Sequence, residues 1–72
     1  MDLTETYREY TGSIEYSEED QAFFGKVLGL RSLISYEGDT IDELLENFRE
    51  AVDDYLAVCE EVGINPERAY EA

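Results

Sequence analysis

The residues in this sequence that could do chemistry are mainly carboxylates. Asp and Glu number 19 against five Lys and Arg, there is no His, and the formal net charge is -14. A metal-dependent nuclease needs several carboxylates that converge on its metal ions. The expected strands contribute only Glu15, while Glu37 and Asp39 fall in a turn. These carboxylates are too few and too scattered, so the sequence predicts no catalytic residue and no metal site.

The other reactive groups favour a structural interpretation. The acidic run Glu18-Glu19-Asp20 lacks the spacing, the central Gly and the bidentate Glu of a calcium loop, so we expect a solvated loop there. The one cysteine, Cys59, lies within an apolar stripe with no His or Lys near it in sequence, and we expect a buried, inert thiol. Without any His, a Ser or Cys nucleophile lacks its usual base. We therefore predict that the chain is not an enzyme and takes no cofactor.

The charge balance excludes several classes of ligand. A chain with one Lys and a net charge of -14 cannot neutralise nucleic-acid phosphates, so we expect no direct DNA binding, and an anionic membrane would repel it. No apolar run approaches the ~20 residues that span a bilayer, and the N-terminus lacks the basic start and apolar stretch of a signal peptide. The expected compartment is the cytoplasm.

The length and the apolar content predict one small folded domain over residues 1–72. Hydrophobic residues make up 43% and aromatic residues 12% of the chain, which is too much for a solvated tail. A domain of this size buries only about 60% of its unfolded surface, so its core is thin. Added stability from a homo-oligomer or a partner is therefore expected.

A long amphipathic helix over residues 40–63 is the clearest element of the sequence. Thr40 and Glu43 form a capping box, and Gly63 supplies a C-terminal stop. At 100° per residue the apolar side chains between these caps fall within an arc of about 120°, as expected for a helix packed on a sheet. They are Ile41, Leu44, Leu45, Phe48, Val52, Tyr55, Leu56, Cys59 and Val62.

Three short strands are expected before this helix, within residues 10–36. Their alternating and β-branched patterns favour an antiparallel sheet with the helix on one face, a β-β-β-α arrangement of the α+β class. Gly38 is expected to supply the positive φ of the turn into the helix. The predicted segments are an N-terminal arm at 1–9, strands at 10–16, 23–28 and 33–36, the helix at 40–63 and a tail at 64–72.

The second expected strand carries large apolar side chains on both of its faces, at Phe23 and Phe24. In the alternation of a strand, the side chains of Leu28 and Leu33 also fall on the face opposite to that of the apolar residues beside them. One helix can cover only one side of three strands. We therefore expect the second face or an edge to be covered by another copy or by a partner.

The outer face of the expected helix carries like charges where stability would not place them. Glu46, Glu50 and Asp54 follow one another at i,i+4, where each like-charge pair costs about 0.2–0.5 kcal/mol. Glu60 and Glu61 lie at the negative end of the helix dipole. Three interpretations stay open: an ordinary solvated face, adaptation to a high-salt cytoplasm, and a negative field that steers a basic partner.

Four segments of the chain closely resemble the N-terminal domain of the HicB antitoxins. They are residues 10–16 (YTGSIEY), 24–30 (FGKVLGL), 34–40 (ISYEGDT) and 48–56 (FREAVDDYL), and residues 66–70 (PERAY) resemble the segment that follows the helix in that family. The resemblance runs in unbroken order over residues 7–70. It implies a degraded, partial RNase H-like domain that belongs to a type II toxin–antitoxin system.

The resemblance also implies a partner. HicB-family proteins bind and silence HicA, a small basic toxin that cleaves mRNA with a His. Many of them continue into a C-terminal module that binds the operator, whereas this chain stops at Ala72, so we expect no DNA-binding module in it.

Contacts with such a basic toxin are expected from one of two surfaces. The first is the acidic helix face, with Glu46, Glu50, Asp53 and Asp54. The second is the uncovered side of the sheet, which we expect to present Tyr16 and Phe24. Two other functions stay open: a stand-alone acidic adaptor or nucleic-acid mimic without a toxin partner, and a residual metal-dependent nuclease of the RNase H type.

Overall fold

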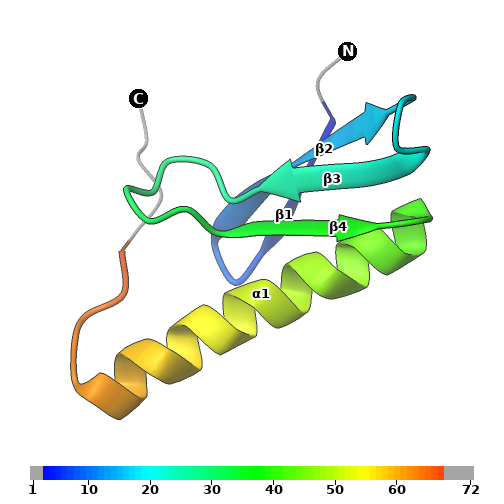
Figure 1. The fold of residues 1–72 in the computed structure, drawn as a ribbon. Coiled ribbons are helices and arrows are strands. Elements are labelled where there is room, and N and C mark those ends of the chain that lie inside the picture. The colour runs from blue at the N-terminus through cyan, green and yellow to red at the C-terminus, as the bar shows by residue number, and fades with distance from the viewer. Residues whose placement is uncertain (1–2, 68–72) are drawn as a thin grey trace.

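The computed structural model describes residues 3–67, which form a four-stranded antiparallel sheet with one helix packed on one face (Figure 1). The strands lie side by side in the order of the sequence. The prediction of an α+β unit with one helix across an antiparallel sheet is therefore confirmed. The elements are β1 (Leu3–Tyr7), β2 (Tyr10–Ser17), β3 (Ala22–Lys26), β4 (Ser35–Gly38) and α1 (Ile41–Val62).

The predicted number of three strands is wrong, because the expected arm at residues 1–9 includes β1. This strand pairs with β2 through a turn at Arg8 and Glu9, whose φ angles are 51° and 71°. Two positive φ angles give the backbone twist that suits a two-residue hairpin, but Asn and Gly are the residues that favour them. Arg and Glu do not favour positive φ angles, so the hairpin forms because β1 pairs with β2 along its length and not because of its turn residues. Residues 1–2 of the expected arm, and residues 68–72 of the expected tail, lie outside the described part of the chain.

The turn before the helix also differs from the prediction. The last strand covers Ser35–Gly38 instead of 33–36, and among the described glycines a left-handed φ occurs at Gly29 and Gly63 but not at Gly38. Gly38 is buried within β4, where an added Cβ would lie 2.6 Å from the backbone nitrogen of Leu44. A glycine is needed there because the first turn of α1 packs directly on the strand.

The sheet contains an interruption that Tyr36 fills. Regular pairing of β2 with β3 covers Glu15–Ser17, and β2 meets the residue after β3 at an isolated bridge between Gly12 and Val27. Between these points the Ser13 hydroxyl accepts a hydrogen bond from the Lys26 N–H at 3.1 Å. The Tyr36 hydroxyl donates to the Ser13 carbonyl at 2.8 Å. A side chain from β4 thus completes the hydrogen bonding between two other strands.

Two glycines make room for the ring of Tyr36. An added Cβ at Gly12 would lie 2.1 Å from the Tyr36 hydroxyl, and one at Gly25 would lie 1.9 Å from the Ser13 carbonyl oxygen. The ring of Phe48, from α1, packs on Tyr36 with a centroid separation of 5.1 Å. Tyr36 is therefore held between the sheet and the helix at the centre of the core.

The helix has the ends that the sequence predicts. The Thr40 side chain accepts a hydrogen bond from the Glu43 N–H at 3.1 Å, and Gly63 has the left-handed φ of 77°. The Ile64 N–H donates to the Cys59 carbonyl at 2.9 Å, which completes a Schellman cap. The helix buries four side chains completely or nearly so: Leu44, Phe48, Val52 and Cys59. Burial of Cys59 was also expected.

Glu67 attaches the segment after the helix to the rest of the fold. Its carboxylate accepts hydrogen bonds from the backbone N–H groups of Arg31 (2.8 Å) and Ser32 (3.2 Å) and from the Ser32 hydroxyl. These bonds, the Ser32 hydroxyl first, hold the pKa of Glu67 below its usual value. Its backbone bonds the hydroxyls of Tyr10 and Tyr55. Residues 64–67 thereby close one end of the core.

We expect the substitution Gly25→Ala to lower the free energy of unfolding by about 2–4 kcal/mol, because the new methyl group meets a backbone oxygen that cannot move freely. Urea unfolding followed by circular dichroism measures this. Ser35→Ala, at an exposed position of the same sheet, is the control and should change stability by no more than about 0.5 kcal/mol. Equal stability of the two variants would contradict this account of the glycine.

We expect alkaline pH to weaken the fold through Tyr36. Burial raises the pKa of Tyr36 to about 12 from 10.0, so the folded chain holds this proton more tightly than the unfolded chain. The resulting stability is complete below pH 10 and is lost as the pH rises toward 12, by up to about 2–3 kcal/mol. Tyr36→Phe should be less stable at pH 7 and lose less between pH 9 and 11.5. Equal losses of stability in the wild-type protein and in Tyr36→Phe over this pH range, measured by urea unfolding, would contradict the role of Tyr36.

Candidate partner-binding surfaces

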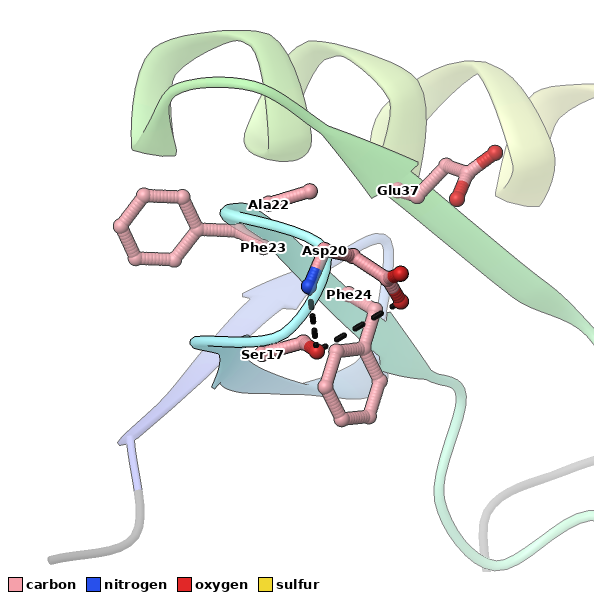
Figure 2. Close-up of a pocket in the computed structure, with 6 residues that line it drawn as sticks. All are labelled: Ser17, Asp20, Ala22, Phe23, Phe24 and Glu37. Carbon is pink, nitrogen blue, oxygen red and sulfur yellow. Dashed lines mark hydrogen bonds between the residues drawn. The ribbon is translucent and has the colours of Figure 1, made fainter.

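The two aromatic candidates lie on opposite faces of the sheet, so they do not form one surface. Tyr16 pairs with Phe23, and their rings pack 4.8 Å apart on the side that carries α1. Phe24 points to the other side, as Figure 2 shows. The prediction that the uncovered sheet presents both Tyr16 and Phe24 is therefore wrong for Tyr16, because its even position in β2 places it with Tyr10 and Ile14 on the helix side.

The uncovered face of the sheet is mainly polar. The alternation of the strands places Thr11, Ser13, Glu15 and Ser17 of β2 there, and Phe24 is its one large apolar side chain among the paired strand residues. Phe24 is 41% exposed. Phe23 packs against the core on the helix side and Phe24 lies on the other side, so the prediction that this strand carries a large apolar side chain on each face is confirmed. Covering of the second face by another copy or a partner stays a prediction.

A shallow depression of about 310 Å³ lies beside Phe24 at the β2–β3 hairpin (Figure 2). The Asp20 N–H donates to the Ser17 hydroxyl at 3.2 Å, which holds the turn in shape. Six residues line it: Ser17, Asp20, Ala22, Phe23, Phe24 and Glu37. The exposed ring of Phe24 makes the depression an area for apolar contact.

The outer face of α1 presents three of the predicted contact residues to solvent without an ion pair. Glu46, Glu50 and Asp54 are exposed, and none of them has an ion-pair partner among residues 3–67. Arg49 does not pair with any of them. Their like charges at i,i+4 therefore remain uncompensated, and this face is a continuous source of negative potential.

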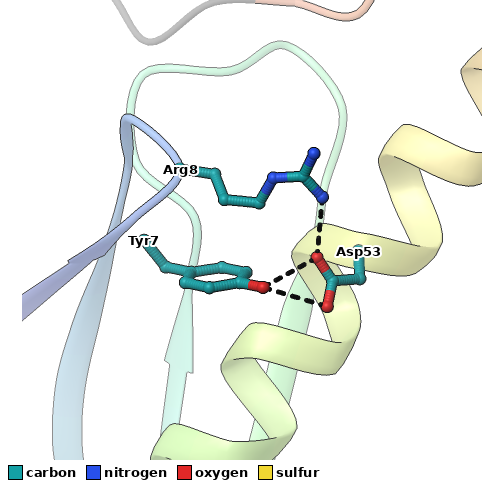
Figure 3. A network of polar contacts seen from close by, with 3 residues as sticks. All are labelled: Tyr7, Arg8 and Asp53. Carbon is teal, nitrogen blue, oxygen red and sulfur yellow. Dashed lines mark hydrogen bonds and ion pairs between the residues drawn. The ribbon is translucent and has the colours of Figure 1, made fainter.

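Asp53, the fourth predicted contact residue on the helix, instead serves the fold. Its carboxylate accepts hydrogen bonds from the Tyr7 hydroxyl at 3.0 and 3.1 Å and pairs with Arg8 at 3.0 Å (Figure 3). The hydrogen bond to Asp53 is the main cause that raises the pKa of Tyr7 above its usual value. Asp53 thus joins the end of β1 to the helix, 45 residues away from Arg8 in the chain.

The C-terminal end of α1 adds to the negative field. Its last turn contains no basic residue, and Glu60 and Glu61 are exposed there. The helix dipole places partial negative charge at the same end. The negative potential therefore extends from the first turn of the helix, where Asp42 and Glu43 lie, to its last.

The described residues contain no group of three or more His, Cys, Asp or Glu side chains that could hold a metal ion. No helix within residues 3–67 combines the length and the apolar character that crossing a membrane requires.

No protein-family model, curated protein or solved structure matches the chain.

Apolar exposure at the end of the helix is a feature that sequence reasoning missed. Val58, Val62 and Ile64 are 47%, 61% and 58% exposed. Val62 was expected to face the sheet with the rest of the apolar stripe. The sequence did indicate this exposure through the lengths of the elements. The predicted helix is much longer than the predicted strands, so the strands cannot cover its whole length.

We expect Asp53→Ala to destabilise the fold and Asp54→Ala, at the neighbouring position, to leave it unchanged or slightly stabilised. The first substitution removes an exposed ion pair with Arg8 worth about 0.2–1 kcal/mol, together with the hydrogen bond from Tyr7. The second relieves the repulsion between Asp54 and Glu50. Urea midpoints in low salt compare the two variants, and a larger loss in Asp54→Ala would show that the polar cluster in Figure 3 does not stabilise the fold.

Proposed function

We propose that this chain is the toxin-binding domain of a HicB-like antitoxin of a type II toxin–antitoxin system, acting in the cytoplasm. It binds a small basic toxin of the HicA type, which cleaves mRNA, and neutralises it in a stoichiometric complex. The domain contributes no catalysis. Its layers of antiparallel sheet and helix are compatible with the degraded RNase H-like domain that the motifs imply, and this finer fold assignment is part of the proposal.

The observation that carries the proposal is the uncompensated charge on α1. Glu46, Glu50 and Asp54 lie one turn apart on the exposed face and have no ion-pair partner among the described residues. Each like-charge pair lowers helix stability. A partner that is rich in Lys and Arg removes this repulsion when it binds. The carboxylates, which do not help the chain to fold, therefore favour binding of such a partner.

The motifs of the resemblance coincide with residues that build the core. Gly12, Gly25 and Tyr36 lie in three of the four segments, and in the structure they meet at one point of the sheet. Phe48 from the fourth segment packs on the Tyr36 ring and beside Gly12. The resemblance therefore rests on residues that determine the fold, which supports shared architecture with the family more strongly than a match of surface residues would.

The proposed mechanism has two physical steps. The negative field of α1 attracts the basic toxin and raises the rate of encounter, an effect that weakens as salt screens the charges. Close contact then covers the surface with which the toxin binds RNA. An enzyme that needs a basic surface for RNA is inactive while carboxylates occupy that surface.

We expect the double substitution E50K/D54K to abolish or strongly weaken toxin neutralisation, because it places positive charge opposite a basic surface. The measurement is growth rescue in cells that co-express the proposed HicA-type toxin, with affinity measured by titration calorimetry. The double substitution E15K/E37K is the matched control: it changes the net charge equally, but on the uncovered face of the sheet.

The two variants separate the proposed surfaces. Loss of neutralisation in E50K/D54K alone supports the helix face, and loss in E15K/E37K alone moves the contact to the sheet. If the wild-type protein binds no basic partner and instead gains stability steeply up to molar salt, the charge is an adaptation to salt and the proposed function is wrong.

A further inference from the structure

The C-terminal part of α1 extends beyond β4. The helix has 22 residues and the adjacent strand β4 has four, which correspond to about 33 Å and about 13 Å. In Figure 1 the last turns of α1 run past the start of β4. Tyr10 and Tyr55 pack together on one side of this overhang, with ring centroids 6.3 Å apart, so that side is covered.

The other side of the overhang carries exposed apolar residues. Val58 lies eleven residues after Asn47, which is three helical turns plus about 20°, so the two share one line along the helix. Asn47 donates from its side chain to the Glu37 carbonyl of β4 at 2.6 Å, which places this line on the β4 flank. Val58, Val62 and Ile64, named here the apolar end of α1, are each about half exposed or more.

Carboxylates border the apolar end along the solvent side. On a helical projection Asp54 and Glu61 lie within about 60° of Val58, toward the outer face that carries Glu50. Both carboxylates are exposed, and neither has an ion-pair partner among residues 3–67. An apolar patch with an anionic rim has the layout of a protein interface, in which a desolvated centre is surrounded by polar groups.

Addition of a strand to β4 does not explain this flank. The Asn47 side chain already donates a hydrogen bond to the Glu37 carbonyl of β4. A fifth strand beside β4 would need this carbonyl for its own hydrogen bonds. A second copy of the chain does not fit either, since each copy carries a net charge of -14 and would bring its own anionic rim against the first. The charge on the rim selects a cationic partner.

We propose that the apolar end of α1 is the contact that determines how long the basic toxin stays bound, a proposal that rests on the proposed function above. The partner presents an apolar side chain, flanked by Lys or Arg, to Val58 and Val62. The carboxylates of the rim and of the outer face set the rate of association, and the valines set the rate of dissociation.

The test measures binding kinetics of the purified wild-type domain and of its variants with the catalytically inactivated toxin as the probe, over a range of salt concentrations. V58S/V62S should raise the dissociation rate about tenfold and leave the salt dependence of association unchanged. E50K/D54K should instead slow association and flatten its salt dependence. Val and Ser have similar helix propensities, so the helix is preserved, and circular dichroism checks this.

Ile41→Ser is the control, because Ile41 is 41% exposed at the opposite end of the same helix. If V58S/V62S dissociates no faster than the control, the inference is wrong while the proposed function stands. If the wild-type domain does not bind the toxin at all, both are wrong. Sedimentation of the domain alone at low salt tests the second copy: a dimer that V58S/V62S disrupts would also overturn the inference.

Discussion

The hydrogen bond from the Tyr36 hydroxyl to the Ser13 carbonyl is the contact on which the rest of the fold depends. It lies in a gap between β2 and β3, it requires glycine at positions 12 and 25, and it holds the ring against which Phe48 packs. A buried carbonyl without a partner is costly, so the phenol both satisfies the backbone and fills the core. The sheet and the helix are joined at this point, and a core this small has few alternatives.

Because the core is built from aromatic and aliphatic groups, the charged side chains that serve the fold, such as Asp53 and Glu67, act at its surface. No charged side chain among residues 3–67 is buried, and the Arg8–Asp53 pair lies at the surface. The remaining carboxylates of the helix are therefore free to shape an external field. The same helix supplies the apolar stripe on one side and that field on the other, so stability and recognition reside in different faces of one element.

Prediction from sequence succeeded for α1 and failed where partners are distant in the chain. The caps at Thr40 and Gly63 act within one helical turn, so their residue types are sufficient to locate the ends. The strand β1 depends on pairing with β2 through a turn of unfavourable residues, and the role of Gly38 depends on the approach of the helix. The predicted contact site was similarly mixed, since Glu46, Glu50 and Asp54 are exposed as expected, while Asp53 is engaged by β1.

The sequence by itself determined the amphipathic helix, its ends and the acidic character of its outer face, because periodicity and capping are local properties. Only the tertiary structure decided which residues share a surface. It separated Tyr16 from Phe24, engaged Asp53 in the fold, and left Val58 and Val62 exposed beyond β4. The physical reason is that burial and pairing depend on strand register and on the relative lengths of packed elements, which arise from contacts between residues far apart in the chain.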